Sequence, residues 1–240
     1  MKRFVLFFMV ALLSIGLISA TFAANPKIYA KNNVLSVYLT NNSTTSSDMT
    51  LIVKAEGGGT TYFDEGASIK YIIPTANVAN WTTRAFNDSA WTTAVSGIGY
   101  ADGDDNTTVP GPPQSSVLVR YHFDAANAST AKTITLWFDY DDAYIAWLND
   151  VEIGRSDNIK AVAVGAIPDW DAGVKGGFVD HEATRVVVGK PNATRWTGAI
   201  GWGQQQISKH DVAVDVGDPV TAVSPKAKIT STWGEIKSVR

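Results

Sequence analysis

A short acidic loop offers the clearest ligands for a metal ion in this sequence. Asp102, Asp104 and Asp105 surround Gly103 and are followed by Asn106. Carboxylate and amide oxygens are the hard ligands that Ca²⁺ takes, so the loop predicts a structural calcium site. The spacing is not that of an EF-hand, because no Glu follows at the twelfth position. An Asx turn, in which the carboxylates bond neighbouring backbone N–H groups, explains the pattern equally well.

Three Trp residues lie in irregular, Gly-rich segments, where a flat side chain can be presented to a ligand. With their polar neighbours they form the candidate binding set: Asp169, Trp170, Arg195, Trp196, Trp202 and Gln204. An indole can stack on a sugar ring while the neighbouring polar groups hydrogen-bond the hydroxyls, so we expect a glycan as the ligand. The competing interpretation is that these Trp side chains cap the ends of the hydrophobic core.

Patterns for catalysis are missing from the sequence. The three His residues are scattered and form no HExxH motif, and neither a Gly-x-Ser-x-Gly elbow nor a phosphate-binding loop occurs. With no Cys in the chain, thiolate zinc sites, cysteine nucleophiles and disulfides are excluded. Asp and Glu are plentiful enough for a glycosidase pair, but no spacing selects one. We therefore expect a binding or structural module and not an enzyme.

The segments that must position these residues have the two-residue period of strands. In Ser116–Phe123 the apolar side chains alternate with a second face that carries Arg120 and His122. Asn149-Asp150 predicts a tight hairpin between the next two strands, although Gly would suit the second turn position better. The strands flanking it, and the others predicted by pattern, are 34–40, 49–55, 68–73, 133–140, 143–148, 151–155, 161–164, 185–188 and 212–216. Many short strands without an amphipathic helix predict an all-β antiparallel sandwich, of the jelly-roll kind.

Several blocks between Trp81 and Asn158 match a known pattern. They are Trp81, Phe86–Trp91, Gly97–Asp105, Val119–Phe123 and Asp139–Arg155. With these blocks, about a third of the chain resembles the galactose-binding-like jelly-roll modules of secreted bacterial proteins. The resemblance implies a carbohydrate-binding-like module that is not itself catalytic. One departure is Asp150, where the family usually has Gly.

A second departure concerns the order of the strands. Residues 33–40 with 45–49 resemble the family's closing strand, yet they lie at the start of the chain. Our hypothesis is that residues 27–50 occupy the closing strand's place. A strand at 34–40 that was unpaired or outside the sandwich would contradict it.

The two ends of the chain differ in composition from the middle. Residues 1–23 have the basic start, apolar centre and small-residue end of a secretory signal peptide. We therefore expect residues 24–218 to form one sandwich domain, with its family-like core at 81–158, that is secreted, periplasmic or on the cell surface. Residues 219–240 resemble a tail found on secreted proteins of marine bacteria, and either a sorting or anchoring signal or a disordered remnant fits it. The tail is too polar to span a membrane.

The net charge of the chain limits the classes of partner that it can bind. Loss of Lys2 and Arg3 with the signal peptide lowers the formal net charge from −3 to −5, which argues against nucleic acid and anionic membranes as partners. The expected partner is a glycan or cell-surface polysaccharide. A structural or adhesive surface protein is the alternative, and a small glycan-active hydrolase is the second alternative.

Overall fold

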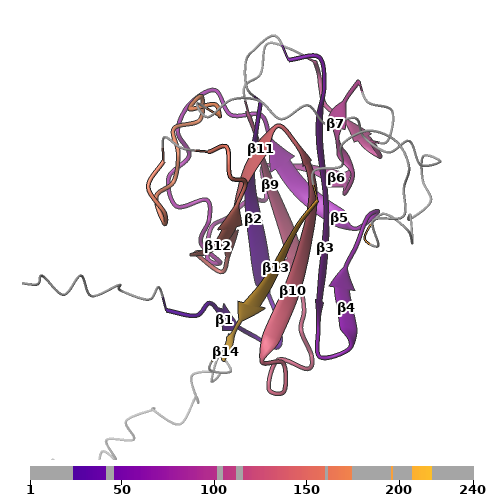
Figure 1. Ribbon diagram of the computed structural model, residues 1–240, viewed down its shortest axis with the longest axis vertical. Coiled ribbons are helices and arrows are strands. Elements are labelled where there is room, and N and C mark those ends of the chain that lie inside the picture. Colours follow the sequence, from indigo (N-terminus) through magenta and orange to yellow (C-terminus); the bar gives the residue numbers. More distant parts are fainter. Residues whose placement is uncertain are drawn as a thin grey trace, which may run out of the picture.

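The computed structural model of the protein describes residues 24–41, 46–101, 105–111, 116–159, 162–174, 196 and 207–217. These residues form two six-stranded, mostly antiparallel sheets that pack together, which confirms the predicted all-β sandwich (Figure 1). In the part of the chain that is described, no helix is long and apolar enough to cross a membrane.

Hydrogen bonding defines the order of the strands in each sheet. Sheet 1 has the order β12 (Val151–Arg155), β11 (Ala143–Leu148), β2 (Asn33–Thr40), β9 (Ser116–Phe123), β5 (Ser68–Ile72), β6 (Thr92–Val95). Sheet 2 has the order β13 (Ile207–Ala213), β10 (Thr133–Asp141), β3 (Met49–Gly57), β7 (Ile98–Tyr100), β8 (Thr107–Thr108), and β4 (Thr60–Phe63) also pairs with β3. A separate parallel pair joins β1 (Lys27–Ile28) to β14 (Asp215–Val216), so both described ends of the chain lie side by side (Figure 1).

The inner core between the sheets follows from the two-residue period. Along β9 the side chains at 117, 119, 121 and 123 enter this core, and along β10 those at 134, 136, 138 and 140 do so. Alternate residues of a strand point to opposite faces, so the predicted alternation is confirmed in both strands. Tyr121 is fully buried here, and the ring of Phe63 stacks on it at 4.8 Å between centroids.

Sheet 1 is also covered on its outer face, a feature that was not predicted from the sequence. Two covering segments, residues 73–91 and the described residues of 156–174 (156–159 and 162–174), pack on it and enclose a second, outer cluster. From the sheet come Tyr38, Leu118, Ala143, Ile145 and Trp147, and from the covering segments come Trp81, Trp91, Ile159 and Val174. Burial on both faces explains why every residue of β2 and of β11 is buried.

The β11–β12 hairpin forms at the predicted turn. Asn149 and Asp150 both have positive φ, 48° and 82°, as a tight two-residue hairpin requires. The Asn149 side chain also accepts a hydrogen bond from the Val34 backbone at 2.8 Å and donates one to the Lys27 carbonyl at 2.7 Å. The turn therefore fastens the N-terminal segment to the sandwich.

The early strand lies at the centre of sheet 1. β2 pairs antiparallel with β9 on one side over its full length, and with β11 on the other side from Leu35 to Thr40. The outcome that would have contradicted the closing-strand hypothesis, an unpaired or external strand, is not observed.

Two predicted strands differ from the structure. Residues 162–164 of the predicted strand 161–164 form a bend and a turn. The carbonyls of Val162 and Ala163 accept hydrogen bonds from the Arg155 guanidinium at 2.6 and 3.1 Å, so a side chain holds this segment where a strand ladder was expected. The strand predicted at 212–216 begins earlier, as β13, and is interrupted at Val214 before β14. The strand predicted at 185–188 lies outside the described residues.

Candidate functional site

A pocket of about 350 Å³ lies over the outer face of sheet 1 and contains two of the predicted binding residues, Asp169 and Trp170. Tyr38 of β2 and Leu118 of β9 belong to its sheet side. The two covering segments supply the rest of the lining: Asn77, Val78, Ala79, Asn80, Trp81, Ile167, Pro168, Asp169 and Trp170. This lining is mostly apolar with a few polar groups, which is the usual composition of a ligand-binding pocket.

Hydrogen bonds between the covering segments shape this pocket. Asn77 donates from Nδ2 to Asp169 Oδ1 at 2.7 Å, and its own Oδ1 accepts the Trp170 backbone N–H at 2.8 Å. The Tyr38 hydroxyl donates to the Asp169 carbonyl at 3.3 Å, and the Ser116 hydroxyl donates to the Trp170 carbonyl. Burial raises the pKa of Tyr38, so its hydroxyl keeps its proton and stays a donor. The loop at 168–171 is therefore pinned to both the neighbouring segment and the sheet.

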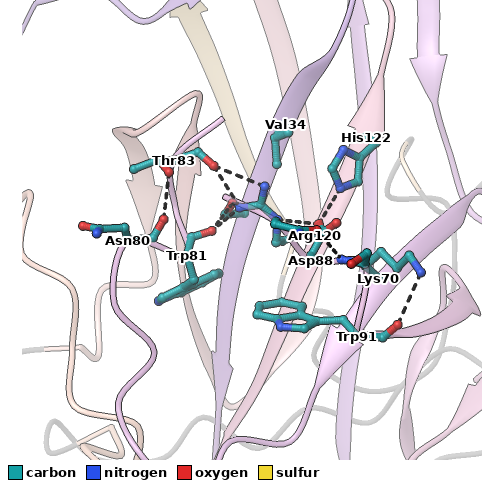
Figure 2. A network of polar contacts seen from close by, with 12 residues as sticks. Val34, Lys70, Asn80, Trp81, Thr83, Asp88, Trp91, Arg120 and His122 are labelled. Atoms are coloured by element: carbon teal, nitrogen blue, oxygen red, sulfur yellow. Dashed lines mark hydrogen bonds and ion pairs between the residues drawn. The ribbon is translucent and has the colours of Figure 1, made fainter. Parts of the chain in front are cut away.

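A fully buried guanidinium holds the other covering segment in place. Arg120 donates from Nε to Asp88 Oδ2 at 2.7 Å, and from Nη1 and Nη2 to the Thr83 carbonyl at 3.2 Å. It also donates to the Trp81 carbonyl, and Figure 2 shows these bonds spreading from one side chain of β9. Because Trp81 lines the pocket, Arg120 fixes the backbone behind one pocket wall.

The carboxylate of Asp88 joins Arg120 to a partly exposed histidine. His122 Nε2 lies 2.6 Å from Asp88 Oδ2, and 45% of the His122 side chain is exposed. Burial acts to raise the pKa of Asp88, but the hydrogen bonds and charges of His122 and Arg120 outweigh it and hold that pKa below its usual range. Asp88 is therefore ionised at neutral pH and neutralises the buried guanidinium.

Aromatic rings fill the space behind the pocket wall. Trp81 contacts Trp147 edge-on at 5.5 Å between ring centroids and Trp91 at 6.3 Å, and Phe86 contacts Trp91 at 5.6 Å. Trp81, Trp91 and Trp147 are all buried, so their rings pack the outer cluster.

Trp196 lies against the opposite sheet and is not part of this pocket. Its ring contacts Trp137 of β10 at 6.3 Å, and its Nε1 donates to Asp64 Oδ1 at 3.1 Å. Trp137 lies on the outer face of sheet 2, because its neighbours Leu136 and Phe138 enter the inner core. The structure therefore separates Trp170 from Trp196. Arg195, Trp202 and Gln204 lie outside the described residues.

The predicted calcium loop is described only at its end. Asp105 is half-buried, and its Oδ1 accepts a hydrogen bond from the Thr50 hydroxyl at 3.4 Å. Asp102 and Asp104 lie outside the described residues. Within the described ranges, no three His, Asp or Glu side chains gather as metal ligands.

The residues that position the pocket escaped sequence reasoning. Arg120 alternates with core residues and reads as a solvent-facing side chain until the covering segment is known. A usable signal was the pair of Trp residues at 81 and 91 between two strands, because two indoles need a surface to cover.

The arrangement offers binding chemistry: an open pocket, an aromatic residue at its edge, and amide and carboxylate groups beside it. Comparison of the chain with protein-family models, curated proteins and solved structures finds no significant match.

Proposed function

We propose that the protein is a secreted, non-catalytic carbohydrate-binding module that takes a glycan or cell-surface polysaccharide into the pocket at Trp170. The observation that carries this proposal is the pocket itself, in which half-buried Trp170 stands beside the side chains of Asn77, Asn80 and Asp169. An indole supplies apolar contact area and amides and carboxylates orient hydroxyls, which together suit a sugar ring.

The shape of the site supports binding at a preformed surface. Asn77 and Asp169 are hydrogen-bonded to each other, and the loop at 168–171 is bonded to Tyr38 and Ser116 from below. Side chains that are already ordered lose less conformational entropy when a ligand binds. Weakly binding sugars benefit most from such preorganisation.

The sequence resemblance extends this proposal to fold family and location. A galactose-binding-like jelly roll accords with two packed antiparallel sheets and with a central β2 between β9 and β11. Residues 1–23 would direct the chain out of the cytoplasm. The proposed module also carries a structural Ca²⁺ held by the loop that ends at Asp105.

A glycan array, read with calcium and again with EDTA, tests the function. Trp170→Ala should weaken binding to any glycan found by at least about tenfold, because Trp side chains dominate interface energies. Trp196→Ala is the matched control and should leave binding within about twofold of wild type, since Trp196 lies on the opposite sheet. Loss of binding in EDTA that calcium restores would support the proposed ion.

Three outcomes would overturn the proposal. Equal losses in the two Trp variants would place the ligand elsewhere. Adhesion or self-association by a folded protein that binds no glycan would favour the structural or adhesive alternative. Turnover that one carboxylate substitution abolishes would favour the hydrolase alternative.

A further inference from the structure

The charge at the pocket is one-sided. Asp169 is the only charged side chain among its described lining residues, and it is exposed at the pocket edge. Asp171, two residues on, is also exposed and lies close enough to Tyr38 for its charge to act on the phenol. A ligand that enters therefore meets the carboxylate of Asp169, with the charge of Asp171 nearby, and none of the described lining residues opposes it with a positive charge.

Only one of the two carboxylate oxygens of Asp169 accepts a hydrogen bond from the described residues. Oδ1 accepts the hydrogen bond from Asn77, while Oδ2 takes part in none among the described residues. The bond to Asn77 fixes the orientation of the carboxylate at the pocket. A fixed carboxylate oxygen with open lone pairs forms its strongest hydrogen bonds with a cationic donor.

We infer that the pocket selects a glycan built of amino sugars with a free, protonated amine, such as a 2-amino-2-deoxyhexose polymer. This inference rests on the proposed function and adds the ligand's chemical class. The ammonium group donates to Asp169 Oδ2 while the sugar ring packs at Trp170. A uronate or sulfated glycan is disfavoured, since its anions would face the Asp169 carboxylate with no positive charge among the described lining residues to offset it. A neutral sugar gains the contact with Trp170 but no charge-assisted bond.

Calorimetry with three oligosaccharides of equal length tests the inference. The probes are a glucosamine oligomer, its fully N-acetylated form and an oligogalacturonate. We expect the glucosamine oligomer to bind about fivefold more tightly than the N-acetylated form, as for a partly exposed ion pair. The oligogalacturonate should bind most weakly. The preference should shrink in high salt and as the pH rises through the pKa of the sugar amine.

Two variants assign the preference to one carboxylate. Asp169→Asn keeps an oxygen for Asn77 but removes the charge, so it should erase the preference for the glucosamine oligomer over its N-acetylated form. Asp215→Asn is the matched control, because it removes the same charge from exposed β14. It should retain the full preference.

The outcomes separate the inference from the function. If no oligosaccharide binds the folded wild-type protein, the proposed function fails and the inference fails with it. If the N-acetylated oligomer or the uronate binds as tightly as the glucosamine oligomer, and Trp170→Ala abolishes that binding, the function stands and the inference is wrong. An oligolysine that binds as tightly as the glucosamine oligomer would also overturn it, by showing a site for cationic peptides.

Discussion

At the scale of single residues, the most consequential side chain is Arg120. Its guanidinium is fully buried, and its N–H groups bond Asp88, Ser36 and the carbonyls of Trp81 and Thr83. Burial lowers the pKa of Arg120 while Asp88 acts to raise it, and the guanidinium keeps its charge because its ordinary pKa is so high. Residues 80–88 belong to no strand, so they have no ladder of backbone hydrogen bonds to the sheet. The hydrogen bonds of Arg120 attach this segment to β9 instead.

Replacing Arg120 tests this role. Arg120→Met removes the guanidinium that neutralises Asp88 and leaves the carbonyls of Trp81 and Thr83 without this donor, so the free energy of unfolding should fall by about 3–5 kcal/mol. Urea denaturation measures it. Lys209→Met is the control: Lys209 and Asp211 form an exposed ion pair, whose loss should cost less than about 1 kcal/mol. Similar losses in both variants would show that the buried network contributes little.

At the scale of elements, sequence periodicity recovers what each strand buries but not what covers it. The bounds of β9, β11 and β12 agree with the predicted ones, because alternation and the Asn149-Asp150 turn are local features. Short strands such as β7 and β8 were not predicted, since two or three residues contain no period. The same limit applies to the pocket. Asp169 and Trp170 stood out by composition, but Asn77, 92 positions earlier than Asp169, joins them only through the fold.

At position 150 the preference of a tight turn for Gly is outweighed by a hydrogen bond that only a longer side chain can make. Gly suits its φ of 82° better, yet Asp150 Oδ1 accepts a hydrogen bond from the buried Thr82 hydroxyl at 2.9 Å. The side chain therefore links the β11–β12 hairpin to the covering segment at 73–91. A Gly at this position could not make this link.

Two substitutions at Asp150 separate backbone strain from this hydrogen bond. Asp150→Ala keeps an unfavourable φ and loses the acceptor, so it should destabilise the protein by about 2 kcal/mol. Asp150→Gly loses the same bond but relieves the backbone, so its free energy of unfolding should stay within about 1 kcal/mol of wild type. Thermal or urea unfolding of both variants measures the difference. Equal effects would mean that φ at this turn carries no cost.

At the scale of the whole molecule, the two sheets meet through a polar contact as well as through the inner core. His210 of β13, in sheet 2, lies with Nε2 2.6 Å from the hydroxyl of Tyr144 of β11, in sheet 1. Gly154 of β12 permits this approach, since a Cβ there would stand 2.5 Å from the imidazole ring. The ring of Phe138 also contacts the imidazole edge-on, at 5.7 Å between ring centroids. Burial raises the pKa of Tyr144, so its hydroxyl donates and the imidazole accepts as the neutral base.

This contact makes the stability of the sandwich depend on pH. An unfolded His titrates near 6.5, and burial lowers the pKa of His210 in the folded protein. Between these two pKa values the unfolded chain binds a proton that the folded chain does not. The free energy of unfolding should therefore fall as pH drops below about 6.5, by up to about 1.4 kcal/mol per pH unit, and level off below the folded pKa.

Urea titrations at a series of pH values measure this dependence. The pH range in which stability changes, and the behaviour of a His210 variant, identify the group that causes it. Asp88 also has a lowered pKa, but its contribution is lost only as pH falls below about 3.9, the ordinary range of Asp, so the two windows are distinct. His210→Gln keeps an acceptor for the Tyr144 hydroxyl and cannot titrate, so its stability should be flat from pH 7 to pH 5. A slope that persists in this variant would assign the dependence to other groups, whereas a flat profile would make His210 a proton-sensitive joint between the two sheets.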